Sequence, residues 1–262
     1  MNDANAQGPL GKFCWYEYMG DDVAAAAAFY EKVVDWTVKS GGLTDYEYRI
    51  ASVGEVGVAG LMKIPAEAKA MGAPACWNGY IWVPDVDAAA TKLVAAGGSV
   101  KRPGTDIPGV GRFAVVADPD GAIFMLFRDH GGNPPPAPPA GTPGLVGWHE
   151  LQASDGAAGF AFYSKLLGWK KDSEFDMGAM GIYHLFSTGH GEFGGVMTKA
   201  PQAPGHYWLY YFNVAAIDAA VERLTAAGGK VVNGPHPVPG DHWIVPALDP
   251  QGALFALVAP KR

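Results

Sequence analysis

The feature that most constrains this chain is an internal duplication, in which residues 12–129 align with residues 145–260. CWYEYMGDDVAAAAAFYEKVVDW matches GWHELQASDGAAGFAFYSKLLGW, and VPDVDAAATKLVAAGGSV matches VAAIDAAVERLTAAGGKV. The closing segments DPDGAIFMLF and DPQGALFALV also correspond. A period of about 130 residues is too long for a solenoid, and it indicates a duplicated domain.

A proline-rich stretch separates the two repeats. It reads HGGNPPPAPPAGTPG, and its six prolines favour extended polyproline II geometry. We therefore predict an N-terminal tail over residues 1–11, a first module over 12–129, a linker over 130–144 and a second module over 145–262.

The same element order is expected in both repeats. An alternating strand precedes Asp22 or Asp155, each placed to cap a helix. A second, alanine-rich helix ends at Gly97-Gly98 or Gly228-Gly229, which suit a left-handed C-terminal residue. The closing Asp-Pro-x-Gly turn predicts a hairpin, because proline presets φ and glycine tolerates positive φ. Strand, helix and three strands are thus expected four times.

Charge and hydropathy exclude several kinds of partner. With 49% apolar and 17% charged residues the chain is predicted to be a soluble globular protein. Its formal charge of −7 argues against nucleic acid or an anionic membrane as partner. No basic-then-apolar leader and no apolar run of about 18 residues occurs, so a cytoplasmic location is expected.

This element order, with the FY…W helix end, the AGG helix end and the DPxG hairpin, resembles the vicinal oxygen chelate superfamily. That superfamily includes glyoxalase I, bleomycin and fosfomycin resistance proteins and extradiol dioxygenases, and the chain is most similar to its two-module glyoxalase-like members. The resemblance implies an α+β class with paired βαβββ units in curved mixed sheets, and a ligand site on the concave sheet face.

The resemblance also implies where a divalent metal would be held. The family's His, Gln and Glu positions fall here on Trp15, Trp77 and Met125 in the first repeat, and on Trp148, Trp208 and Ala256 in the second. Indole, thioether and methyl groups are poor ligands for such cations. We therefore expect no metal site and no cofactor, the family metal having been lost, if the strand register is right.

The four tryptophans Trp15, Trp77, Trp148 and Trp208 have two possible roles. They could fill the concave space as core, or they could line an aromatic cleft that binds a planar or apolar small molecule. Both interpretations predict that their rings lie on the concave face.

Glu17 and Glu150 lie two residues after Trp15 and Trp148, so strand alternation places each carboxylate on the face of its tryptophan. A carboxylate there needs a partner or a proton. Arg49 and His184, at equivalent positions of a neighbouring strand, are the expected partners. Each glutamate could form a structural pair, or act as a general acid/base or ligand anchor.

Six of the seven histidines lie in the second repeat: His149, His184, His190, His206, His236 and His242. His242 replaces Gly111 of the first repeat, beside Trp243 where that repeat has Arg112. His242 is therefore a third catalytic candidate, and Arg112 a further ligand-binding candidate.

Three functions remain open. The first is metal-free binding of a small, aromatic or apolar molecule, as in drug sequestration. The second is a metal-independent lyase or isomerase that uses Glu150 or Glu17 as acid/base. The third is metal-dependent glyoxalase-type lyase or dioxygenase chemistry. The duplication is compatible with a monomer or a homodimer.

Overall fold

In the computed structural model, the described residues are 10–42, 46–131, 138–189, 191–203 and 205–262. Three parts of the sequence predictions therefore lie outside the described residues: the tail up to residue 9, residues 132–137 of the linker, and His190.

The first repeat contains β1 (Phe13–Gly20), α1 (Val23–Val34), β2 (Thr37–Ser40), β3 (Tyr48–Val53), β4 (Val56–Lys63), α2 (Ala66–Ala70), β5 (Cys76–Trp82), α3 (Val86–Ala95), β6 (Ser99–Ile107), β7 (Gly111–Ala117) and β8 (Ile123–Asp129). The second contains β9 (Val146–Ala153), α4 (Gly156–Leu167), β10 (Lys170–Asp176), the 3-10 helix η1 (Gly178–Met180), β11 (Ile182–Ser187), β12 (Glu192–Thr198), β13 (Tyr207–Asn213), α5 (Ile217–Ala226), β14 (Lys230–Val231), β15 (His236–Val238), β16 (His242–Leu248) and β17 (Leu254–Ala259).

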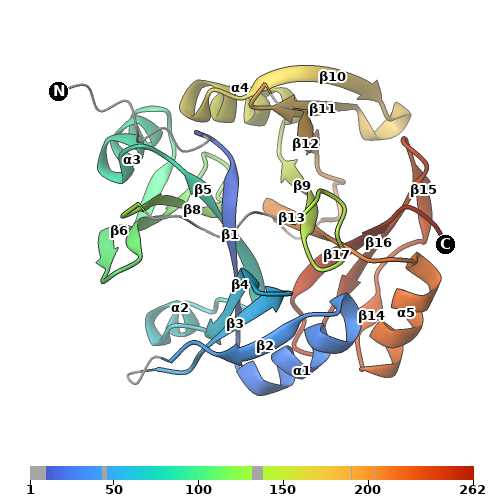
Figure 1. Ribbon diagram of the computed structural model, residues 1–262. Helices are drawn as coiled ribbons and strands as arrows, with labels where there is room; N and C mark the ends of the chain where they lie inside the picture. The colour runs from blue at the N-terminus through green and yellow to red at the C-terminus, as the bar shows by residue number, and fades with distance from the viewer. Residues whose placement is uncertain (1–9, 43–45, 132–137, 190, 204) are drawn as a thin grey trace. The chain divides into compact units, whose positions relative to one another are not determined.

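The strands form two mixed sheets (Figure 1). Their hydrogen-bonded neighbours follow the orders β2-β3-β4-β1-β5-β8-β7-β6 and β10-β11-β12-β9-β13-β17-β16-β14, and β15 pairs with β16. The first and last strands of each βαβββ unit run parallel, as β1 does to β4, β5 to β8, β9 to β12 and β13 to β17. The predicted α+β class, with duplicated βαβββ units in curved mixed sheets, is confirmed.

The compact units of the chain do not coincide with the two repeats. The described residues of unit 1 lie within Met1–Cys14, Asn78–Pro134 and His149–Trp208, and those of unit 2 lie within Trp15–Trp77, Pro135–Trp148 and Leu209–Arg262. Each unit therefore combines half of the first repeat with half of the second. The reason is helix packing, because α3 contacts α4 in unit 1 and α1 contacts α5 in unit 2.

The core of unit 2 lies around the helix α1. Asp22 caps this helix by accepting the Ala25 N–H at 2.9 Å, as predicted. The fully buried Tyr30 donates its hydroxyl to Asp249 at 3.3 Å and accepts the Trp77 indole N–H at 2.8 Å. Asp249 opens the DPQG turn of the second repeat, so a buried polar chain joins the two halves of the unit.

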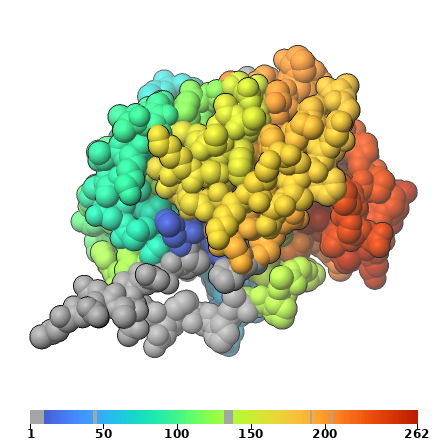
Figure 2. Space-filling view, turned by 90° about the horizontal axis from the view of Figure 1, so that it is seen from above, coloured from blue at the N-terminus to red at the C-terminus, as the bar shows by residue number. Residues whose placement is uncertain are grey.

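The core of unit 1 repeats this arrangement around α4, which lies against α3 on the surface seen in Figure 2. Asp155 caps α4 by accepting the Ala158 N–H at 3.0 Å. Tyr163 donates its hydroxyl to Asp118, of the DPDG turn, at 3.1 Å and accepts the Trp208 indole N–H at the same distance. No helix in the described part of the chain is long and apolar enough to cross a membrane.

Candidate functional site

Two of the site candidates, Glu17 and Glu150, lie on the face of β1–β4 or of β9–β12 that points away from the helix packed on those strands. This face is here called the distal face. In unit 2, Tyr18 contacts Tyr30 of α1, so its neighbour Glu17 lies on the distal face of β1–β4. In unit 1, Leu151 and Val196 adjoin α4 at Gly159, so Glu150 lies on the distal face of β9–β12.

Glu17 is held by a tyrosine of the neighbouring hairpin. Its side chain is 5% exposed and hydrogen-bonded with Tyr48 of β3, which is also bonded by the Trp15 side chain. Burial, followed by the Glu17 charge, raises the pKa of Tyr48 well above its usual value. Tyr48 therefore stays protonated and donates to the Glu17 carboxylate.

Glu150 has the equivalent arrangement in unit 1, with more polar surroundings. Tyr183 of β11 donates its hydroxyl to Oε2 of Glu150 at 3.1 Å, and Nε2 of Gln152 donates to Oε1 at 2.7 Å. Burial, and then the charge of Glu150, raises the pKa of Tyr207 of β13. A half-buried carboxylate thus lies among two phenols and an amide.

A glycine makes room for the tyrosine in both places. A Cβ at Gly60 would overlap the Tyr48 ring and approach Glu17, and a Cβ at Gly195 would overlap the Tyr183 ring. Gly60 lies opposite Glu17 in β4, and Gly195 lies opposite Glu150 in β12. The same Glu–Tyr–Gly arrangement is therefore built twice.

Arg49 and His184 are not the partners of the two glutamates, so this prediction is wrong by one residue along each strand. Arg49 pairs with Glu47, their nearest atoms lying 2.9 Å apart. His184 lies 2.8 Å from Glu174 and stacks near Phe160 of α4. Because side chains alternate along a strand, both point away from the distal face that their neighbours Tyr48 and Tyr183 occupy.

Trp77 and Trp208 are likewise placed on the wrong face by the sequence prediction. Both are buried against helices, where their indole N–H groups bond Tyr30 and Tyr163. Trp15 does lie on the distal face, within reach of Ile50 and Tyr48. Trp148 is half-buried in β9, two residues before Glu150.

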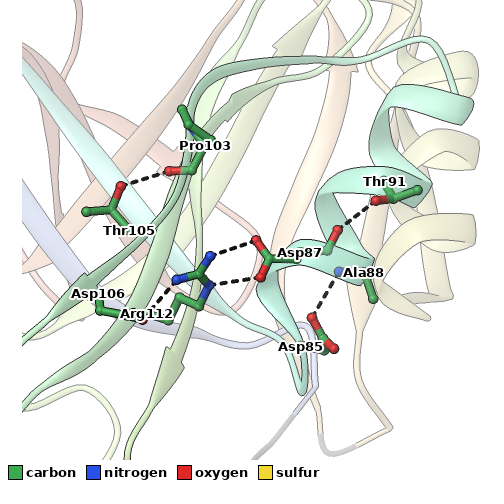
Figure 3. A network of polar contacts seen from close by, with 8 residues as sticks. All are labelled: Asp85, Asp87, Ala88, Thr91, Pro103, Thr105, Asp106 and Arg112. Atoms are coloured by element: carbon green, nitrogen blue, oxygen red, sulfur yellow. Dashed lines mark hydrogen bonds and ion pairs between the residues drawn. The ribbon is translucent and has the colours of Figure 1, made fainter.

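Arg112 bonds two aspartates and so connects a helix to a β-hairpin (Figure 3). It donates from Nε and Nη2 to the two carboxylate oxygens of Asp87 in α3, at 3.0 and 3.1 Å, and from Nη1 to Asp106 at 3.0 Å. These bonds to two carboxylates raise the pKa of its guanidinium. Arg112 thereby fastens α3 to the β6–β7 hairpin, and the carboxylates that it bonds do not include that of Glu150, the distal-face carboxylate of its unit.

The histidine candidates are also placed by the structure. His242 is exposed at the start of β16, and its Nδ1 atom lies 2.7 Å from the Gly240 carbonyl oxygen. It is not brought together with Glu17, the distal-face carboxylate of its own unit. His149 faces the core instead, stacked on Phe13 with ring centres 4.1 Å apart.

Sequence reasoning missed Tyr48, Tyr183, Gln152 and Tyr207. The sequence contains a usable signal, because YEYRI and GIYHL each place a tyrosine directly before Arg49 or His184. The glycine opposite each glutamate, in VAGLM and FGGVM, was a second signal. Together they indicate an aromatic side chain lying across a small residue.

Trp77 and Trp208 face the helices, so they do not occupy the family's ligand positions on the concave face. At the closing position of each repeat, a thioether and a methyl group do not fit a divalent cation. Met125 and Ala256 are fully buried, and the carboxylates of Glu17 and Glu150 are each held by a tyrosine. Within the described ranges, no group of three or more His, Cys, Asp or Glu side chains is arranged to hold a metal ion.

Comparison with known proteins identifies relatives over nearly the whole chain. CFP32 of Mycobacterium tuberculosis, which carries the provisional name of a glyoxylase, is 33% identical over 254 residues, covering 94% of each protein. The anthracycline biosynthesis protein DnrV of Streptomyces peucetius is 32% identical over 271 residues, covering 95% of this chain and 93% of DnrV.

Solved structures share the fold at low sequence identity. The Mn(II)-bound glyoxalase from Novosphingobium aromaticivorans is 17% identical with a TM-score of 0.67, covering 96% of this chain and 82% of that one. The 2,2',3-trihydroxybiphenyl 1,2-dioxygenase from Sphingomonas wittichii is 13% identical with a TM-score of 0.68, covering 95% and 90%. The family model described as Glyoxalase/Bleomycin resistance protein/Dioxygenase superfamily matches residues 12–126 and 145–257. The chain belongs to that superfamily.

Proposed function

We propose that this protein binds a small aromatic or apolar molecule on the distal faces of β9–β12 and β1–β4, without the family's divalent metal. The observation that carries the proposal is the carboxylate held by a tyrosine on both faces, Glu150 by Tyr183 and Glu17 by Tyr48. Burying a carboxylate costs several kcal/mol in general, and apolar residues of similar size are often as stable there. Its presence on both faces favours a ligand anchor over a purely structural pair.

The relatives support an aromatic ligand. DnrV is named for the biosynthesis of anthracyclines, which contain planar fused rings. Trp15, Tyr48, Tyr183 and Tyr207, which surround the two glutamates, offer ring surfaces against which such a molecule could stack.

A direct test is a titration with 1,8-dihydroxyanthraquinone, followed by quenching of tryptophan fluorescence in buffer containing EDTA. We expect saturable binding that the chelator does not change, and recovery of the probe unaltered. The variant Glu150→Gln is expected to bind about tenfold more weakly, a difference of about 1.4 kcal/mol, because the charged acceptor is lost.

Glu222→Gln, the same exchange on an exposed face of α5, is the matched control and should bind as the wild type does. Quenching that never saturates, or that EDTA abolishes, would remove the proposal.

A second candidate is metal-independent lyase or isomerase activity, because Glu150 beside Tyr183 and Tyr207 pairs a base with two protonated phenols. The glyoxylase name of CFP32 suggests methylglyoxal with glutathione as the trial substrate. Turnover by metal-stripped protein that disappears in Glu150→Gln or Glu17→Gln would favour this candidate over binding. Turnover that requires added Mn(II) would favour metal-dependent chemistry instead.

A further inference from the structure

The two distal faces differ at one polar position. Gln152 follows Glu150 by two residues in β9, and the equivalent residue in β1 is Met19. Both positions face a methionine of the neighbouring parallel strand, since Gln152 lies opposite Met197 and Met19 lies opposite Met62. The β9–β12 strands therefore carry a polar amide at Gln152, where the matching β1–β4 strands carry the apolar side chain of Met19.

The hydrogen bond from Gln152 to Glu150 determines the orientation of the Gln152 amide. A carboxylate only accepts hydrogen bonds, so the amide nitrogen faces Glu150, at 2.7 Å from Oε1. The amide oxygen is consequently turned away from Glu150. Tyr183 also commits its hydroxyl proton to Glu150, at 3.1 Å. The amide oxygen of Gln152 is thus an acceptor on this part of the distal face, which also carries the phenol of Tyr207.

The Glu17 face differs in both burial and polarity. Glu17 is 5% exposed, whereas Glu150 is half-buried. The thioether of Met19 stands where the second repeat has an amide, and it is at best a weak acceptor. A ligand on the Glu17 face would meet mainly apolar and aromatic surface.

We infer that the Glu150 face selects ligands that carry a hydrogen-bond donor, such as a phenolic hydroxyl on an aromatic ring, and that Gln152 is the residue that determines this specificity. The inference rests on the proposed binding function and adds to it the chemistry of the ligand. The Glu17 face lacks the selecting amide and discriminates little between ligands with and without a donor.

The probes are 2-naphthol and 2-methoxynaphthalene, which share a ring system and differ in the hydroxyl proton. Isothermal titration of the wild-type protein should show two sites per chain. One site should prefer 2-naphthol by about tenfold, the usual contribution of one hydrogen bond in a partly buried site, and the other should bind both probes about equally. In Gln152→Met, which installs the residue of the first repeat, the preference should fall below about threefold, the remainder being due to Glu150.

Gln202→Met is the matched control, because it makes the same exchange at an exposed loop position, and it should keep the tenfold preference. Thermal melting verifies that each variant is folded, and the wild-type preference tests the inference even if Gln152→Met does not fold.

Equal affinity of the wild type for both probes, or an unchanged preference in folded Gln152→Met, would overturn the inference while leaving the proposed binding function in place. Failure of the wild type to bind either probe or the anthraquinone would instead remove the binding function, and this inference with it.

Discussion

Replacing Tyr163 by Phe is expected to destabilise the protein by about 2–4 kcal/mol at pH 7. The hydroxyl bonds both Asp118 and the Trp208 indole, and all three side chains are buried. Its removal leaves a buried carboxylate with one donor fewer and a buried indole N–H without its acceptor, which is among the costlier effects of a single substitution. Urea unfolding followed by circular dichroism measures the loss.

The loss should shrink as the pH is lowered. Burial raises the pKa of Asp118, and the hydroxyl of Tyr163 opposes that rise. Without the hydroxyl the pKa of Asp118 rises further, so the carboxyl takes up a proton at higher pH in the variant and avoids the cost of a buried charge. The difference in stability between variant and wild type is therefore largest at neutral pH and smaller near pH 4.

Tyr30→Phe tests the same chemistry in unit 2, where the hydroxyl joins Asp249 and Trp77. Tyr46→Phe, at a residue 50% exposed, is the control and should change stability by less than about 0.5 kcal/mol. If Tyr163→Phe and Tyr30→Phe are as stable as this control, the two buried hydrogen-bond networks contribute nothing to the stability of the fold.

Acidification from pH 6.5 to about 4 is expected to cost the wild-type protein about 3 kcal/mol of stability through His149 alone. Burial lowers the pKa of this imidazole from 6.5 to about 4. Its Nδ1 lies 2.7 Å from the Phe193 carbonyl oxygen, which only accepts, so Nδ1 carries the proton of the neutral ring.

The unfolded state binds the proton of His149 at a higher pH than the folded state does, so stability falls on acidification. As the pH falls below 6.5 the unfolded chain protonates this histidine, whereas the folded protein does so only near pH 4. The stability is therefore complete above pH 6.5, falls between those values, and loses nothing more through this group at lower pH.

His149→Phe isolates this contribution, because Phe keeps an aromatic ring beside Phe13 and does not titrate. We expect the variant to be less stable at pH 7 but to lose less stability on acidification, measured as the shift of the urea midpoint. His242→Phe changes an exposed histidine and should retain the wild-type acid dependence. Parallel pH profiles for His149→Phe and wild type would contradict the assignment.

Local features were predictable because they depend on residues close together in the chain. Asp22 and Asp155 cap their helices, and Gly97 and Gly228 take the predicted left-handed conformation at φ 95° and 88°. The DPxG turns close the β7–β8 and β16–β17 hairpins as expected. Their aspartates accept backbone N–H groups within the turn, a strictly local requirement.

The residues of the distal faces were harder to predict from the sequence. Side chains alternate along a strand, so an error of one residue in register places a side chain on the opposite face. Glu17 and Glu150 were found from their spacing to Trp15 and Trp148. The tyrosine partners of the two glutamates were missed because the charge of Arg49 and His184 made these residues the expected partners. The neighbouring tyrosines have the sequence pattern of ordinary core residues. Only the opposing glycines distinguish those tyrosines, and that relation spans two strands.

The amino-acid sequence by itself determined the duplication, the helix-capping aspartates and the aspartate-opened turn of each repeat. It also determined the order of elements, apart from α2, η1 and the additional strand β15. It could not decide which aspartate meets which tyrosine, because the repeats are alike and either pairing satisfies the local patterns equally. The tertiary structure decided that Tyr30 bonds Asp249, 219 residues away, and that Tyr163 bonds Asp118. The physical reason is that this choice depends on how whole helices pack, α1 with α5 and α3 with α4, and that packing is a property of the assembled cores.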